Sequence, residues 1–153
     1  MSADLTRKDM IFLRALAHDK LQLGGVNLDG VNLHHLQLEG ISLPHASLRD
    51  TNLQGAYLIN AMLFATDLTR ADLRGAGLVG VRLTQAKLVE ADLRQADLRN
   101  SACAWADFSG ADVRGANFSG VADLHLADLS CVVADETTVW PLDVWPDFQP
   151  PGS

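Results

Sequence analysis

Acidic and basic side chains recur at a spacing of twenty residues in the middle of this 153-residue chain. Each acid comes two positions before an arginine, and the six residues are Asp72, Arg74, Asp92, Arg94, Asp112 and Arg114. Carboxylate and guanidinium groups placed side by side can form a solvated ladder of ion pairs, which contributes little to stability. Alternatively, the arginines can grip an anionic partner, because a guanidinium group matches the geometry of carboxylates and phosphates. We prefer the ladder, and the choice depends on how the backbone arranges these residues.

Side chains that commonly carry out catalysis or hold metal ions show no convergent pattern. The histidines are scattered along the chain, and the two cysteines lie outside any CxxC motif. These residues are His18, His34, His35, His45, His125, Cys103 and Cys131. Neither a GxSxG motif nor a phosphate-binding P-loop motif occurs. We therefore expect no enzyme, no cofactor and no metal site, with Cys103 as a filler of the core.

Composition indicates a single domain that can build a core, with 48% hydrophobic and 20% charged residues. The net charge of -7 is concentrated near the C-terminus, because residues 121–153 contain six acids and no base. The basic surface that nucleic-acid binding requires is missing, so we expect no direct DNA or RNA contact. Early acids and an arginine within the first apolar run exclude a signal peptide and a membrane span, so we expect a cytoplasmic protein.

A repeat of five residues, with sequences such as ADLRG and ADLRQ, runs without a slip through twenty units from residue 21 to residue 120. The third position is leucine in sixteen units, and in the last four it is Cys103, Phe108, Val113 and Phe118. The first position is most often alanine, and the second is mostly Asp, Asn, Gln or Ser. Glycine occupies the fifth position in nine units. A period of five matches neither a helix nor a strand, so the backbone must turn at regular intervals.

This pattern resembles the pentapeptide-repeat family over about two thirds of the chain. The resemblance implies an all-β fold, a right-handed quadrilateral parallel β-helix in which each unit forms one side and four units form one coil. On that template the first and third positions point inward and the others face water. Stacked coils hydrogen-bond like neighbouring strands, about 4.8 Å apart. The fifth position turns each corner, where we expect positive φ angles and type II turns.

The two ends of the repeat predict caps. Residues 6–18 read as a helix, with Thr6 and Asp9 resembling a capping box and Phe12, Leu13 and Leu16 on one side. We expect residues 1–20 to form a helical cap and residues 21–134 to form the β-helix. A one-residue insertion precedes Leu124, and a partial sixth coil should end near Ala134 with Cys131 facing outward. Residues 135–153 should form a capping tail, in which Trp140 and Trp145 fold back near Trp105.

Outward residues twenty apart stack on one another, and one corner of the stack is apolar. It consists of Pro44, Tyr57, Ile59, Met62, Phe64 and Val79, which we call the apolar corner. Contiguous exposed apolar surface usually marks a contact. Three interpretations stay open: ordinary exposed hydrophobic residues, cover by the chain's own tail, or a surface for a protein partner or a second copy.

These features predict a non-enzymatic scaffold that binds a protein partner of unknown identity through its outer faces. A homodimer is one open alternative, and no membrane contact is expected. A different function follows from the resemblance, because some pentapeptide-repeat proteins mimic duplex DNA and inhibit or protect DNA gyrase. Such mimicry implies a long acidic rod, whereas residues 21–120 carry eight bases and ten acids. We therefore prefer the scaffold.

Overall fold

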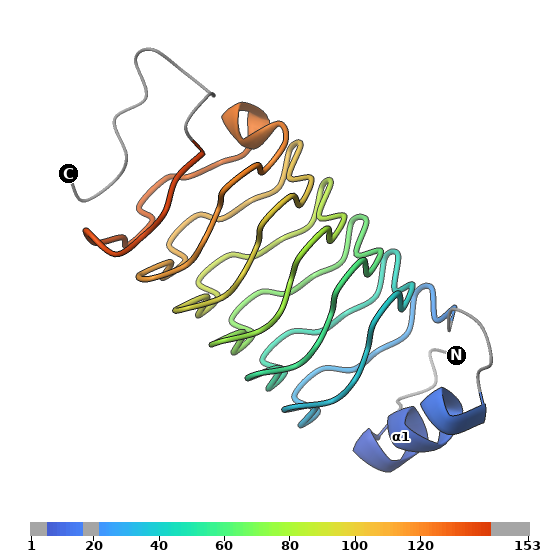
Figure 1. The fold of residues 1–153 in the computed structure, drawn as a ribbon. Helices are drawn as coiled ribbons and strands as arrows, with labels where there is room; N and C mark the ends of the chain where they lie inside the picture. The colour runs from blue at the N-terminus through green and yellow to red at the C-terminus, as the bar shows by residue number, and fades with distance from the viewer. Residues whose placement is uncertain (1–5, 17–21, 142–153) are drawn as a thin grey trace.

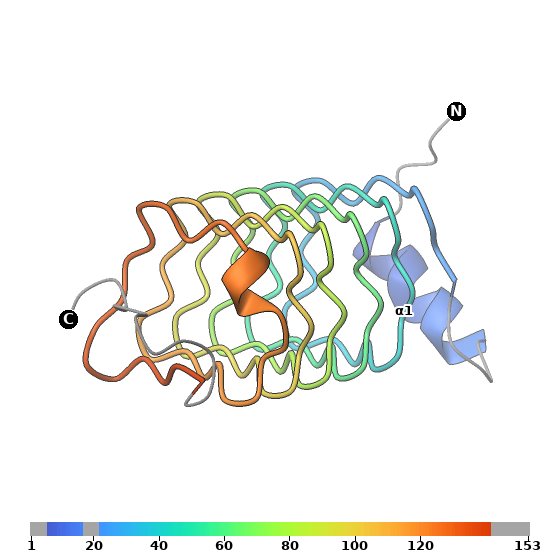
Figure 2. The same cartoon turned by 90° about the horizontal axis from the view of Figure 1, so that it is seen from above.

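The computed structural model describes residues 6–16 and 22–141, and for residues 12–16 it describes only the backbone. The chain winds into a row of square coils that progress along one axis (Figure 1). Helix α1 (Arg7–Leu16) lies beyond the first coil, and the short 3-10 helix η1 (Leu124–Leu126) interrupts the last one. Seen from above, the coils follow one another in parallel and α1 covers one end of the row (Figure 2).

Parallel backbone bridges join each coil to the next and confirm the expected β-helix. Seventeen of the twenty bridges connect residues that are 20 apart, from Gln22 with Ser42 to Ala102 with Ala122. Each bridge involves the second position of a unit, so every side contributes one bridged residue per coil. The hydrogen bonds alternate in direction: Leu33 N–H donates to the Asn52 carbonyl at 2.7 Å, and Asn52 N–H donates to the Val31 carbonyl at 3.0 Å. The four-sided parallel architecture follows directly from this register.

The first and third positions of the units fill the interior, as predicted. The central side chains from Leu28 to Phe118 are all buried, and the alanines beside them are buried too. Each buried leucine stabilises the fold by about 1.5–3 kcal/mol, so the leucine stacks supply much of the stabilisation. In the fifth coil Phe108 and Phe118 meet edge to face with ring centroids 6.1 Å apart. Cys103 is fully buried there, and burial raises the pKa of its thiol to about 11, as expected of an inert core residue.

Every corner has a positive φ angle at the fifth position, but glycine is not required to form it. Nine of these residues are glycines and eleven are other residues, such as His45 with φ 58°. At that corner Ala46 N–H donates to the Leu43 carbonyl at 3.2 Å, which is the hydrogen bond of a β-turn. Glycine matters where a side chain of the preceding coil lies over the corner. A Cβ atom at Gly55 would collide with the His35 ring, so these two residues depend on each other.

The sixth coil is longer than predicted, because the chain absorbs two insertions there. Bridges change from 20 residues apart to 21 at Asp107 with Asp128, and to 22 at Asn117 with Val139. The first extra residue lies near η1, where Leu124 points inward and is fully buried. The parallel backbone bridges between coils thus continue past the expected end at Ala134 to Val139. The exposed Cys131 faces outward as predicted.

Trp140 closes the C-terminal end of the core within the described residues. Its ring stacks on Phe118 with centroids 5.1 Å apart and planes inclined by 16°. This contact places the start of the predicted capping tail against the last coil. Trp105 is 62% exposed. The expected return of the tail to Trp105 and the position of Trp145 concern residues 142–153, which lie outside the described part.

Helix α1 begins with the predicted capping box. Thr6 N–H donates to Asp9 Oδ2 at 2.9 Å, and Asp9 N–H donates to Thr6 Oγ1 at 3.3 Å. The hydrogen bonds from Thr6 lower the pKa of the Asp9 carboxyl. Met10 is fully buried in the same cluster as the leucines of the coils. The expected apolar contacts of Phe12, Leu13 and Leu16 lie outside the described side chains.

Arg7 satisfies carbonyl groups at the open edge of the first coil. Elsewhere the carbonyl groups at these positions accept from the preceding coil, as the Asn52 carbonyl does from Leu33 N–H at 2.7 Å. The first coil has no predecessor, and Arg7 Nη1 donates to the carbonyls of Asn32 and His34 at 2.9 and 3.2 Å. The guanidinium group therefore replaces the backbone donors of a missing coil. Unpaired sheet edges template association, so this contact protects the edge.

We predict that Arg7→Ala increases end-to-end association and lowers the free energy of unfolding by about 1 kcal/mol, because two edge carbonyls lose their donor. Light scattering after size exclusion measures the association, and urea unfolding measures the stability. Lys8→Ala is the matched control, because this substitution removes the same charge from α1 and Lys8 is exposed. Equal behaviour of the two variants would show that Arg7 does not protect the edge.

Candidate functional site

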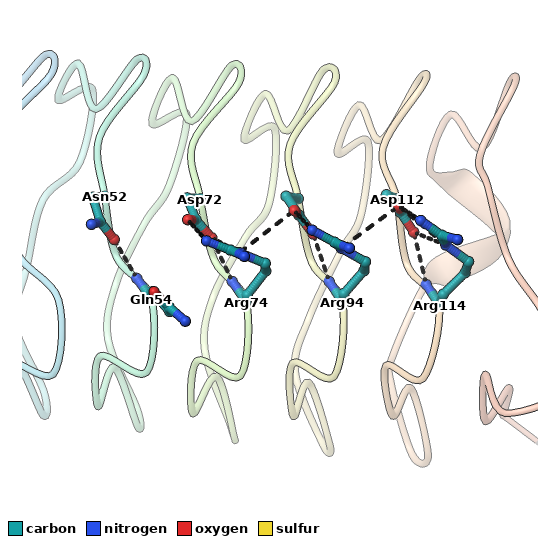
Figure 3. Close-up of polar contacts among 8 residues, drawn as sticks. Asn52, Gln54, Asp72, Arg74, Arg94, Asp112 and Arg114 are labelled. Atoms are coloured by element: carbon teal, nitrogen blue, oxygen red, sulfur yellow. Dashed lines mark hydrogen bonds and ion pairs between the residues drawn. The ribbon is translucent and has the colours of Figure 1, made fainter.

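The second position of many units caps the turn that follows it. An Asp or Asn oxygen at this position accepts from the backbone N–H two residues later, as Asn52 Oδ1 does from Gln54 at 3.0 Å (Figure 3). The same bond occurs in the units of Asp67, Asp107, Asn117 and Asp128. From the sequence we expected the second position only to face water. The preference for Asp and Asn over Glu was the available signal, because only the shorter side chain makes this local bond.

The predicted ladder residues lie side by side on one face, which we call the ladder face. Each arginine turns back to the acid of its own coil, and Arg74 donates from Nε and Nη2 to the two Asp72 oxygens at 2.8 and 2.6 Å. Arg94 and Asp92 repeat these distances, and Arg114 with Asp112 forms the third pair. Between coils, Arg74 Nε lies 3.7 Å from Asp92 and Arg94 Nε lies 3.8 Å from Asp112. Figure 3 shows this continuous alternation.

The ladder is electrically balanced, with three acids and three arginines. Hydrogen bonds from Arg74 and Arg114 hold the pKa values of Asp72 and Asp112 below their usual range. Each arginine in turn has its pKa raised by its own acid. An anionic ligand would have to displace these carboxylates, because both Nε and Nη2 already face them. The geometry thus supports the ladder over the anion site.

A shallow groove of about 420 Å³ runs beside the ladder face. Gly55 and Gly75, two successive corner residues without a side chain, line it together with His35, Arg74 and Arg94. The groove is polar, and its two arginines are the paired ones described above. It therefore has the donors for a weak polar contact, and its open shape does not enclose a ligand.

The apolar corner spans the face opposite the ladder face, with Pro44, Met62 and Phe64, and an adjoining face, with Tyr57, Ile59 and Val79. Tyr57 and Phe64 are 45% and 39% exposed, and the other four members are half-buried. The Phe64 ring meets His45 edge to face with centroids 5.3 Å apart. Met62 pairs with the backbone of Ser42 on one side and Arg82 on the other, which fixes its outward direction. The structure thus brings the six predicted residues together on the surface. The interpretation in which the tail covers them concerns residues 142–153, which lie outside the described residues.

Titratable side chains do not gather into a reactive centre in the described part. Among residues 6–16 and 22–141, no group of three or more His, Cys, Asp or Glu side chains is arranged to hold a metal ion. The sequence suggested separate positions for His34 and His35, yet their rings meet edge to face at 5.5 Å. His34 Nδ1 also lies 2.6 Å from Asn32 Oδ1. His18 lies outside the described residues.

Neither α1 nor η1, the two helices in the described ranges, has the length and apolar character needed to cross a bilayer.

Comparison with known proteins gives a family match and several similar structures. A family model described as pentapeptide repeats matches eight copies over residues 42–76, 76–120 and 103–134. The structure of HetL, a pentapeptide-repeat protein involved in heterocyst differentiation regulation in the cyanobacterium Nostoc, is 21% identical and has a TM-score of 0.45. The match covers 88% of this chain and 79% of HetL. A search of the curated proteins found no match.

Two further structures are similar to parts of the chain. A pentapeptide-repeat protein from the thylakoid lumen of Arabidopsis thaliana is 30% identical, with a TM-score of 0.38, over 65% of this chain and 67% of that one. The plasmid-mediated fluoroquinolone resistance protein QnrB1 is 16% identical, with a TM-score of 0.31, over 76% of this chain and 91% of that one.

We predict that the ladder face makes the fold less stable in acid. The folded-state pKa values of Asp72 and Asp112 are lowered, so their contribution is present above the unfolded pKa of about 3.9 and is lost as the pH falls through the folded values. Asp72→Asn with Asp112→Asn should therefore lose less stability than the wild type as the pH falls from about 5 to about 2. Urea unfolding across the pH series measures the difference.

Asparagine is the matched substitution here, because its side-chain oxygen still accepts from the N–H two residues later, as Asn52 does. The variant therefore removes charge and keeps the cap of the turn. Parallel pH curves for the wild type and the variant would contradict the prediction.

Proposed function

The chain belongs to the pentapeptide-repeat family, whose fold is the right-handed four-sided β-helix, and from this premise we propose that it is a non-enzymatic scaffold that binds a protein partner. The observation that carries the proposal is the apolar corner. Tyr57 and Phe64 project from a regular surface whose other faces carry paired charges. Exposed apolar patches bounded by polar residues usually mark protein contacts.

The rigidity of the coils supports a role in presenting side chains. Coils one to five repeat every 20 residues without a loop insertion, and each is bonded to its neighbours on all four sides. β-Helix enzymes that act on carbohydrates need long loops and clustered acids over a groove, and coils one to five leave no room for such loops. A flat, pre-ordered surface loses little conformational entropy when a partner binds. The face is therefore suited to binding and has no feature that suits chemical transformation.

We place the scaffold in the cytoplasm as part of the same proposal. The similar protein from a thylakoid lumen is a reason to test the compartment directly by fractionation of the native host.

The alternative function, mimicry of DNA against DNA gyrase, has less support. Duplex DNA carries one negative charge per about 1.7 Å of axis. On the ladder face each acid is paired with an arginine in its own coil, so the face offers no run of unpaired negative charge. The six acids of residues 121–153 all come after the five regular coils in the sequence.

We predict that Phe64→Asp combined with Ile59→Lys weakens partner binding at least ten-fold, because the variant places charges within an apolar contact. Quantitative affinity capture from the native host, with mass spectrometry, compares the variant with the wild type. Size exclusion with light scattering shows whether the partner is a second copy.

Gln54→Asp combined with Thr69→Lys is the matched control. Gln54 and Thr69 occupy the fourth position of their units, as Phe64 and Ile59 do. Gln54 lies on the face opposite Phe64, and Thr69 lies on the face opposite Ile59. The control should bind like the wild type. If the partners and the oligomeric state stay the same in both variants, the apolar corner is not the binding surface.

For the alternative function, we predict no effect of the protein on DNA supercoiling by gyrase, with or without a quinolone, at rising protein concentration. The reason is the neutral ladder face described above. Inhibition of supercoiling or protection from the drug would instead support DNA mimicry and would count against the scaffold.

A further inference from the structure

Arg82 differs from every other basic residue of the coils. Residues 22–120 contain eight arginines and lysines, and seven of them lie next to an acid. The seven are Arg49, Arg70, Arg74, Lys87, Arg94, Arg99 and Arg114. Arg82 is exposed, and within the described residues it has neither an ion pair nor a side-chain hydrogen bond. The chain has thus matched its surface cations with acids everywhere in the coils except at this position.

The surroundings of Arg82 are uncharged. Its backbone pairs with Met62 in the preceding coil and with Ala102 in the following one, so these side chains flank it along the stack. The residues at the second and fourth positions of this side in coils two to five form what we call the Arg82 face, and apart from Arg82 none of them carries a formal charge. They are Ser42, Pro44, Met62, Phe64, Arg82, Thr84, Ala102 and Ala104. In the sixth coil, the exposed Asp123 follows Ala122 on the same side.

The two corners that border this face are uncharged as well. One corner has glycine and asparagine in alternation, at Gly40, Asn60, Gly80, Asn100 and Gly120, and the other has His45, Ala65, Gln85 and Trp105. Charges lie on the other three sides: the ladder face, the side with Arg49, Asp67, Lys87 and Asp107, and the side with Glu39, Asp97 and Arg99. In coils two to five, Arg82 is therefore the single charged residue of its side.

Two exposed aromatic side chains lie near Arg82, one in each neighbouring coil. Phe64 and Trp105 project from the coils before and after, with exposures of 39% and 62%. Tryptophan and arginine are the residues most enriched among those that dominate binding energy.

We infer that the Arg82 face binds a protein surface that presents an aspartate or glutamate carboxylate between apolar side chains. An unpaired arginine buried under an apolar partner would lose its hydration without compensation, so the partner has to supply the carboxylate. Met62, Phe64 and Trp105 in turn need apolar groups opposite them. This inference rests on the proposed function, since it assigns the partner's chemistry to a face that shares Pro44, Met62 and Phe64 with the apolar corner.

The test is photo-cross-linking in the native host with p-benzoylphenylalanine in place of Thr84, which lies on the same face two residues from Arg82. Mass spectrometry of the cross-linked peptide identifies what lies over the face. The inference expects a foreign protein, with an Asp or Glu between apolar residues at the cross-linked site. Cross-linking to the chain itself, from its own tail or from a second copy, would overturn the inference.

Charge reversal then tests the pairing. Arg82→Glu should weaken binding of the cross-linked partner at least ten-fold, and changing the partner's acid to Arg should restore binding to Arg82→Glu. Arg114→Glu is the matched control on the opposite face, and it should bind like the wild type. Thermal unfolding followed by circular dichroism confirms that both variants are folded.

The outcomes separate this inference from the proposed function. Binding that depends on Phe64 and Ile59 but not on Arg82 would overturn the assigned carboxylate and leave the scaffold in place. Binding that depends on none of these residues would overturn both. Binding that is lost in Arg82→Glu but not rescued by the reversed partner charge would also contradict the direct pairing.

Discussion

The packing of leucine against alanine inside a square coil is the constraint on which the rest of this structure depends. Each side has room for two inward side chains, and four central residues meet across a narrow interior. Alanine or a β-branched residue fits beside most of the central residues, and only a corner every five residues returns the next leucine to the same depth. The backbone bonds between coils then form without further adjustment, because every coil has the same outline.

The same constraint creates two open edges, and each is closed in a different way. At the N-terminal end Met10 continues the core and Arg7 supplies donors to two edge carbonyls. At the C-terminal end the coil widens by two residues and Trp140 stacks on Phe118. A repeat whose units interact only with their neighbours needs such terminal changes, since its last interfaces have no partner. Departures from the five-residue pattern are therefore found at both ends.

Outward positions are free of the packing constraint, and their differences carry the functional information. Where Asp or Asn follows the small residue, its oxygen caps the turn, and in the ladder the same carboxylate also binds an arginine. One group thus serves backbone and surface together, which leaves the ladder face neutral. The face with Arg82 has the opposite character, with one unpaired cation among small and apolar residues. This contrast between the faces supports the proposed binding role.

The amino-acid sequence by itself determined the coil, the inward positions and the column in which each outward residue lies, because a strict period of five leaves one way to bury the leucines. It also predicted the capping box of Thr6 with Asp9 and the buried state of Cys103. Only the tertiary structure decided how far the sixth coil extends, because insertions at Leu124 and before Val139 break the period that the prediction relied on. It also decided that Arg7 reaches the first edge and that Arg82 forms no ion pair with the described acids. These depend on distances between coils and on the directions of side chains, which a one-dimensional repeat does not contain.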